Sequence, residues 1–161
     1  MEVIHLFQIG DKIVYPMHGA GVVEAIEEKE ILGKTRTYYI IHMPINDMQI
    51  MIPTGKASAV RYVVDGGTLE DVLFQFEHGE SDQSVPWKQR HRMNMEKIKT
   101  GAIYEGAEVV RDLMRQHKGK PLNASEKQLL DTARKIFISE LALIKGLTER
   151  QATDLLESKV S

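Results

Sequence analysis

The chain has 161 residues, of which 42% are hydrophobic and 27% charged, a balance typical of one medium globular domain or two small ones. It contains no cysteine and no run of about 18 apolar residues, which excludes disulfides, cysteine-bound metals and a membrane-spanning helix. The net charge of −2 conceals an asymmetry: residues 1–86 carry 6 basic and 13 acidic side chains, whereas residues 87–161 carry 15 basic and 10 acidic ones. We therefore expect a cytoplasmic protein whose C-terminal half suits a polyanionic partner.

The first third of the chain alternates polar residues with β-branched and aromatic ones, a pattern that predicts strands. Clusters of Gly, Pro, Asn and Asp separate the alternating runs. The strands are expected at residues 12–16, 20–31, 36–43, 48–53 and 59–63. So few short strands suit a small, strongly bent barrel of the SH3 or Tudor type better than a sandwich.

After residue 65 the apolar residues recur at helical spacing. Helices are expected over about 68–78, 86–99, 102–117 and 123–145, with a last short helix after Thr148. The predicted fold class is therefore α+β with two domains. These are a Tudor/SH3-like β-barrel at residues 1–66, a short helix and linker at 67–85, and an all-α helical bundle at 86–161.

The polar residues do not favour an enzyme. The six histidines are scattered, and no two of them have the i, i+4 spacing that would place a metal-binding pair on one helical face. The Gly19-Ala-Gly21 stretch lacks the third glycine and the following helix of a dinucleotide-binding loop. We therefore expect no catalytic residue, no metal site and no cofactor.

Four tyrosines raise the alternative of a peptide-binding barrel, because aromatic walls can hold a methylated lysine. The candidates are Tyr15, Tyr38, Tyr39 and Tyr62. Adjacent residues of a strand point to opposite faces, so Tyr38 and Tyr39 cannot line the same wall. A role in the core or at the rim of the barrel is the preferred interpretation.

The segment "MQIMIP" from Met48 to Pro53 predicts an edge strand, because Pro53 cannot donate a hydrogen bond to a neighbouring strand. Alternation would place Met48, Ile50 and Ile52 on the core face and Met51 on the outer face. An edge with an exposed, adaptable thioether can accept a strand from a partner. An ordinary edge strand remains equally compatible with this pattern.

The segment "SVPWKQRHRMNMEK" holds the only tryptophan, Trp87, among several basic side chains. In a helix that begins near Trp87, Arg90 and His91 share its face. One interpretation is an indole packed across a domain junction, with Arg90 stacked on it. The other is an exposed wedge for a base step, beside cations that neutralise phosphates.

Three segments of the chain resemble a known protein family. The opening "FQIGDKIVYPMHGAGVVEAIEEKEILGKTRTYYII" resembles that of the CarD/CdnL family of bacterial RNA polymerase-binding transcription regulators, whose N-terminal module also occurs in transcription-repair coupling factor. The segments "VPWKQRHRMNMEKI" and "NASEKQLLDTARKIFISELAL" resemble the helical C-terminal domain of that family. The resemblance extends from Phe7 to about Leu156.

The resemblance implies two binding surfaces. The barrel would dock on the RNA polymerase β-subunit lobe through Lys29, Met48, Gln49, Ile50, Met51, Ile52 and Pro53. The helical domain would contact promoter DNA through Trp87, Arg90, Arg92 and Lys127. Lys88, His91 and Lys97 join the expected contacts because they lie in the same segment as Trp87. The indole would wedge into the minor groove at the upstream edge of the melted region.

The function that we expect is therefore regulation of transcription, by stabilising the open promoter complex without reading a specific base sequence. A non-enzymatic scaffold with a peptide-binding barrel is the alternative. In either case we expect a monomer with no cofactor and no membrane association.

Overall fold

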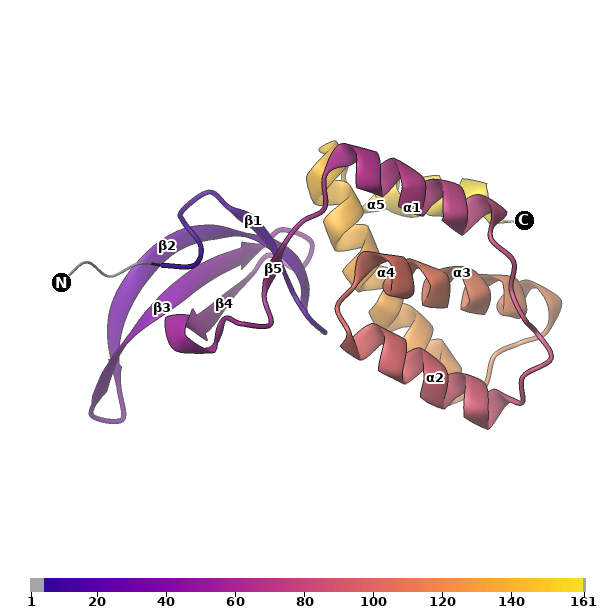
Figure 1. Cartoon of the computed structure of the whole chain (residues 1–161), viewed down its shortest axis with the longest axis horizontal. Helices are drawn as coiled ribbons and strands as arrows, with labels where there is room; N and C mark the ends of the chain where they lie inside the picture. Colours follow the sequence, from indigo (N-terminus) through magenta and orange to yellow (C-terminus); the bar gives the residue numbers. More distant parts are fainter. Residues whose placement is uncertain (1–4, 161) are drawn as a thin grey trace.

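The computed structural model describes residues 5–160, and these form a five-stranded antiparallel sheet followed by five α-helices (Figure 1). The strands are β1 (Lys12–Tyr15), β2 (Gly19–Ile31), β3 (Lys34–Met43), β4 (Met48–Pro53) and β5 (Arg61–Tyr62). Their order in the sheet is β4-β3-β2-β1-β5, so β4 and β5 form its two edges. The predicted fold class is confirmed.

The sheet bends strongly around a small apolar core (Figure 1). Its longest strand, β2, carries a register shift between Val23 and Ala25, and such bulges increase the local twist. The hairpin between β2 and β3 turns at Leu32 and Gly33, both with positive φ, as tight hairpin turns require. The buried side chains of the core are Phe7, Ile13, Val23, Tyr39, Ile41, Met43, Ile52, Ala57 and Val60.

Side-chain caps mark the start of some of the five helices. The helices are α1 (Gly66–His78), α2 (Trp87–Lys99), α3 (Ile103–Gly119), α4 (Ala124–Lys145) and α5 (Glu149–Lys159). Asn123 caps α4, and Gly146 ends it in the left-handed conformation. Thr148 and Gln151 form a capping box at the start of α5, where the sequence predicts a last short helix.

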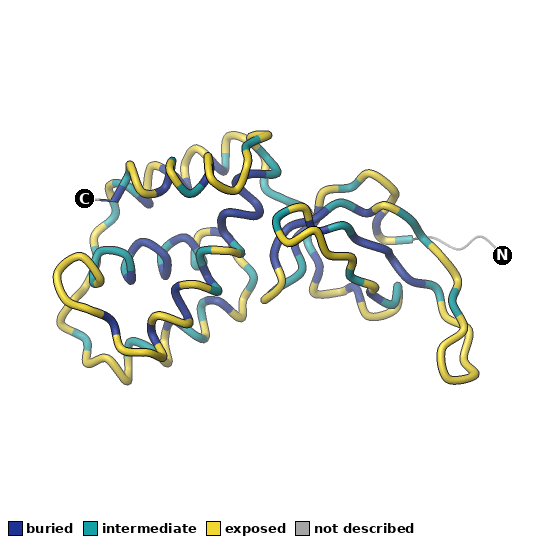
Figure 2. Tube along the Cα trace, turned by 180° about the vertical axis from the view of Figure 1, so that it is seen from behind, coloured by how far each residue is buried: buried dark blue, intermediate teal, exposed yellow. Residues whose placement is uncertain are grey.

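Helix α1 lies closer to the bundle than the sequence suggested. We expected residues 67–85 to form a short helix and linker, but Leu69, Val72, Leu73 and Phe76 of α1 are buried in the same apolar core as α3, α4 and α5. Figure 2 shows these buried positions along the inner faces of the helices. The helical part therefore starts at α1, because the inward face of α1 is fully apolar.

The tyrosines do not line an open cage. Tyr38 and Tyr39 are both buried, and Tyr39 belongs to the barrel core. Tyr15 stacks on His18, whereas Tyr62 is exposed and makes an edge contact with Phe7. The arrangement fits the expected structural role in the core and at the rim.

Candidate functional site

Trp87 is the first residue of α2 and its indole faces outward. Pro86 precedes it, and the backbone carbonyl of Pro86 accepts a hydrogen bond from the N–H of Arg90, which closes the first helical turn. The tryptophan is 44% exposed and belongs to neither hydrophobic core. The buried residues of α2 are Asn94 and Ile98, which lie two and three turns further along the helix. A large aromatic ring is thus presented at the tip of a rigid helix.

Arg90 is turned inward and forms a buried ion pair with Glu126 of α4. Its Nε and Nη2 atoms donate to the two carboxylate oxygens, each at 2.8 Å. The side chains are 16% and 2% exposed, respectively. The hydrogen bonds to Glu126 raise the pKa of Arg90 above its ordinary value, so the guanidinium stays charged. Because its charge is already neutralised, we leave Arg90 out of the proposed DNA contacts.

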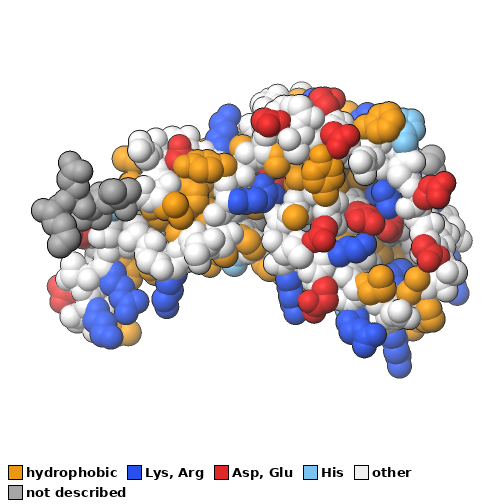
Figure 3. Space-filling model, in the orientation of Figure 1, with side chains coloured by type: hydrophobic (Ala, Val, Ile, Leu, Met, Phe, Trp, Pro, Cys, Tyr) orange, Lys and Arg blue, Asp and Glu red, His pale blue; other side chains and the backbone are white. Residues whose placement is uncertain are grey.

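The other basic residues of α2 that were predicted to contact DNA fall into two groups. Lys88 and Arg92 are exposed, and neither has an ion-pair partner among the described residues. Lys97 pairs with Glu108 of α3 at 3.2 Å, and His91 is half-buried with its Nδ1 atom out of contact with solvent. Lys and Arg side chains project from the lower edge of the helical domain, where α2 lies (Figure 3). Lys88 and Arg92 are therefore the predicted α2 cations that are free to meet phosphates.

Lys127 of α4 lies near the same end of α2. Its neighbour Glu126 is held by Arg90, so the first turns of the two helices are tied together. Lys127 itself is exposed. The sequence pattern missed Glu126, because its role depends on a residue 36 positions away. Its only local signal is the Asn123-x-x-Glu126 spacing of a helix start, and the Asn123 side chain does accept from the Glu126 N–H.

Among residues 5–160, β4 pairs with β3 alone, which leaves its outer edge available for strand pairing. Ile52 is buried in the core, Ile50 is half-buried, and Met51 is 39% exposed on the opposite face, as the alternation predicted. Met48 is an exception to this alternation. The pattern predicts Met48 on the core face, but its side chain is exposed at the start of the strand. The edge thus combines free backbone groups with two exposed thioethers.

Two polar residues of the expected docking surface make contacts within the barrel. Gln49 donates from Nε2 to Glu24 of β2 at 3.0 Å. Lys29 lies in the β2–β3 hairpin and pairs with Glu27 at 3.4 Å, where both side chains are largely exposed. Exposed pairs of this kind contribute little to stability, so Lys29 can exchange Glu27 for an acidic partner.

Within residues 5–160 the structure shows no cluster of three or more His, Asp or Glu side chains arranged to hold a metal ion. In the same residues, none of the helices combines the length and apolar character needed to cross a membrane.

The sequence matches two family models and a known protein. Residues 7–64 match the CarD-like/TRCF RID domain, and residues 71–157 match the CarD C-terminal domain. A Bacillus subtilis (strain 168) protein named "Putative transcription factor YdeB" is 60% identical over 148 residues, which cover 91% of this chain and 97% of that protein. The chain belongs to the CarD family of transcription factors.

Proposed function

We propose that this protein docks on the RNA polymerase β-subunit lobe through β4 and stabilises the open promoter complex with Trp87. The observation that carries the proposal is the outward indole in the first turn of α2, beside the unpaired cations Lys88 and Arg92. Lys127 adds a third exposed cation near that turn. Cations attract the DNA backbone, and an aromatic ring can then stack at an opened base step.

The energies involved are sufficient for regulation. Unstacking a base step costs a few kcal/mol, and an aromatic side chain stacked on a base recovers about 1–3 kcal/mol. Because about 1.4 kcal/mol changes an equilibrium constant tenfold, the wedge can shift the open-complex population roughly 5- to 150-fold. A wedge and phosphate contacts carry little base-sequence information, so the effect extends to promoters of different sequence.

The barrel brings the DNA-binding surface to promoters. Three exposed cations and one aromatic ring make a weak DNA site, and the acidic N-terminal half of the chain does not add to it. Docking on polymerase raises the effective concentration of this site at promoters alone. The exposed face of Met51 makes an apolar contact with the partner, and the free backbone groups of β4 pair with a strand of the lobe.

Met51→Glu tests the docking edge. We expect this substitution to lower the affinity for the isolated β-subunit lobe at least about tenfold, because a carboxylate would be desolvated in the contact. Isothermal titration calorimetry with the lobe measures the effect.

Met17→Glu is the matched control, because Met17 is 40% exposed and lies in the turn between β1 and β2, two strands away from β4. Its affinity for the lobe should equal that of the parent protein. If Met51→Glu also binds the lobe like the parent, β4 is not the docking edge.

A further inference from the structure

Four polar groups join the barrel to the helical domain at one point. Arg61 of β5 donates from Nη1 and Nη2 to the two carboxylate oxygens of Glu140 in α4, at 2.8 and 2.7 Å. One of these oxygens also accepts from the backbone N–H of Val64 at 3.0 Å. Arg61 Nε donates to the carbonyl of Gly101 at 2.9 Å, just before α3. The Glu140 side chain is only 3% exposed and that of Arg61 29%, so this is an ion pair between domains with a buried carboxylate.

A second contact lies beside the ion pair. The Ser139 hydroxyl of α4 accepts from the backbone N–H of Ala20 in β2 at 2.8 Å and donates to the carbonyl of Ile136 at 2.6 Å. Gly19 approaches so closely that a Cβ atom there would lie 2.7 Å from Ser139 Oγ. The β2 backbone therefore lies directly against the Ser139 side chain, with no room for a side chain at residue 19.

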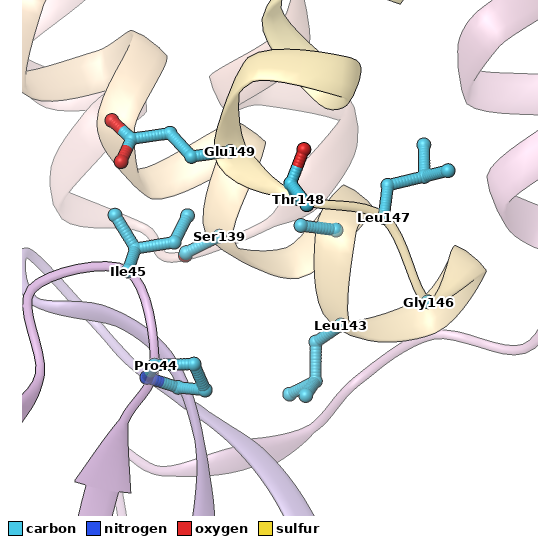
Figure 4. A pocket seen from close by; sticks show the side chains of 9 residues that line it. Pro44, Ile45, Ser139, Leu143, Gly146, Leu147, Thr148 and Glu149 are labelled. Atoms are coloured by element: carbon cyan, nitrogen blue, oxygen red, sulfur yellow. The ribbon is translucent and has the colours of Figure 1, made fainter.

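On another side the junction is open. A pocket of about 470 Å³ separates the turn after β3 from the turn between α4 and α5. Figure 4 shows Pro44 and Ile45 of the barrel facing Leu143 and Thr148 of the helical domain across it. Packing on that side leaves space for movement. The angle between the domains thus depends on the polar contacts of Arg61, Glu140 and Ser139, together with the packing of Ile45 on the helical core.

We propose that Arg61 and Glu140 are positioning residues that hold Trp87 at a fixed distance and angle from the β4 edge. This inference rests on the proposed function, because a wedge carried by a docked barrel is productive only when its helix points at the DNA fork. Domains in one chain move relative to each other by default unless their interface is large and apolar. Here the bidentate pair, with its carboxylate buried, supplements a small apolar contact of Ile45 and Val64 with the helical core. Breaking such a pair leaves a buried charge without its partner.

We call the contacts of Arg61 with Glu140 the joint. Loosening the joint would reduce function by lowering the fraction of molecules in the productive domain arrangement. If the productive domain arrangement falls to about a tenth of the molecules, the apparent effect of the wedge falls about tenfold. Contacts with the polymerase lobe and with DNA, measured separately, would not change. The two apolar cores are separate clusters, so each domain retains its own core when the joint opens.

Glu140→Gln tests the joint. The variant keeps the side-chain size but replaces one acceptor oxygen with an NH₂ group that faces the Arg61 guanidinium. Spin labels on Ser58→Cys and Ser125→Cys, both exposed and in different domains of a cysteine-free chain, report the distance between the domains. We expect a broadened distance distribution, an open-complex lifetime shortened about three- to tenfold, and an unchanged affinity for the isolated lobe.

Asp131→Asn is the control on the same helix, since Asp131 pairs only with Arg134 at an exposed site. It should change neither the distance distribution nor the lifetime. An unbroadened distribution in Glu140→Gln, an unchanged lifetime, or a loss that follows a weaker affinity for the lobe overturns the inference. If Trp87→Ala leaves the lifetime unchanged, the proposed function fails, while the distance distribution still decides whether Glu140 holds the domains.

Discussion

Trp87→Ala is expected to shorten the lifetime of the open promoter complex about 5- to 150-fold, the range that corresponds to the loss of about 1–3 kcal/mol of aromatic stacking. The residue is exposed at the start of α2, so its removal opens no cavity in the helical core. Dissociation of preformed complexes, followed after addition of competitor DNA, measures the lifetime. Affinity for the isolated polymerase lobe should equal that of the parent.

Phe74→Ala is the control for the loss of an exposed aromatic ring. Phe74 lies on α1, is more exposed than Trp87, and contacts His78 of its own helix. Its variant should form complexes with the parent lifetime. Equal lifetimes for Trp87→Ala and the parent would exclude the wedge, whatever the effect of Phe74→Ala.

Arg90→Ala is expected to lower the free energy of unfolding by about 3–5 kcal/mol, because it leaves Glu126 buried without a counter-charge. The loss would also separate the first turns of α2 and α4, which the pair holds together. Denaturant unfolding followed by circular dichroism measures the change. Replacing both partners with apolar residues, as Arg90→Met with Glu126→Leu, should recover most of the stability.

Arg92→Ala is the matched control, two positions away but exposed and without an ion pair among the described residues. Its unfolding free energy should stay within about 0.5 kcal/mol of the parent. Its DNA affinity should instead lose part of its salt dependence, because a phosphate contact is removed. An Arg90→Ala protein as stable as Arg92→Ala would show that the buried pair does not hold the helices.

The sequence predicts the elements of this fold well because their signals are local. Alternation marks the strands, and the capping box at Thr148 and Gln151 marks the start of α5. The domain to which α1 belongs is determined by tertiary packing and not by its local sequence. Its apolar face could cover either the barrel or the bundle, and only the packing of Leu69 and Phe76 against the helical core decides between them.

The candidate site also has some features that local sequence cues predict and others that depend on contacts between distant segments. The exposure of Trp87 and the edge position of β4 follow from local cues, namely its cationic neighbours and Pro53. The pairing of Arg90 with Glu126 and of Lys97 with Glu108 joins distant segments. The sequence around a basic residue does not reveal an acidic partner in a distant segment. Arg90 and Lys97 were therefore expected to be available for DNA phosphates. The joint of Arg61 and Glu140, 79 positions apart, gives no local signal at all.

The most direct test of the central claim uses the fluorescence of the single tryptophan. Since Trp87 is the only indole in the chain, selective excitation reports its environment alone. The protein is titrated with a forked DNA and, separately, with a fully paired duplex of the same sequence. Low salt is used because the attraction between the basic side chains and the phosphates is then strongest. Stacking of the indole on an unpaired base predicts marked quenching by the fork and little by the duplex. Equal quenching by both DNAs, or none by either, would contradict the claim that Trp87 recognises the open strand junction.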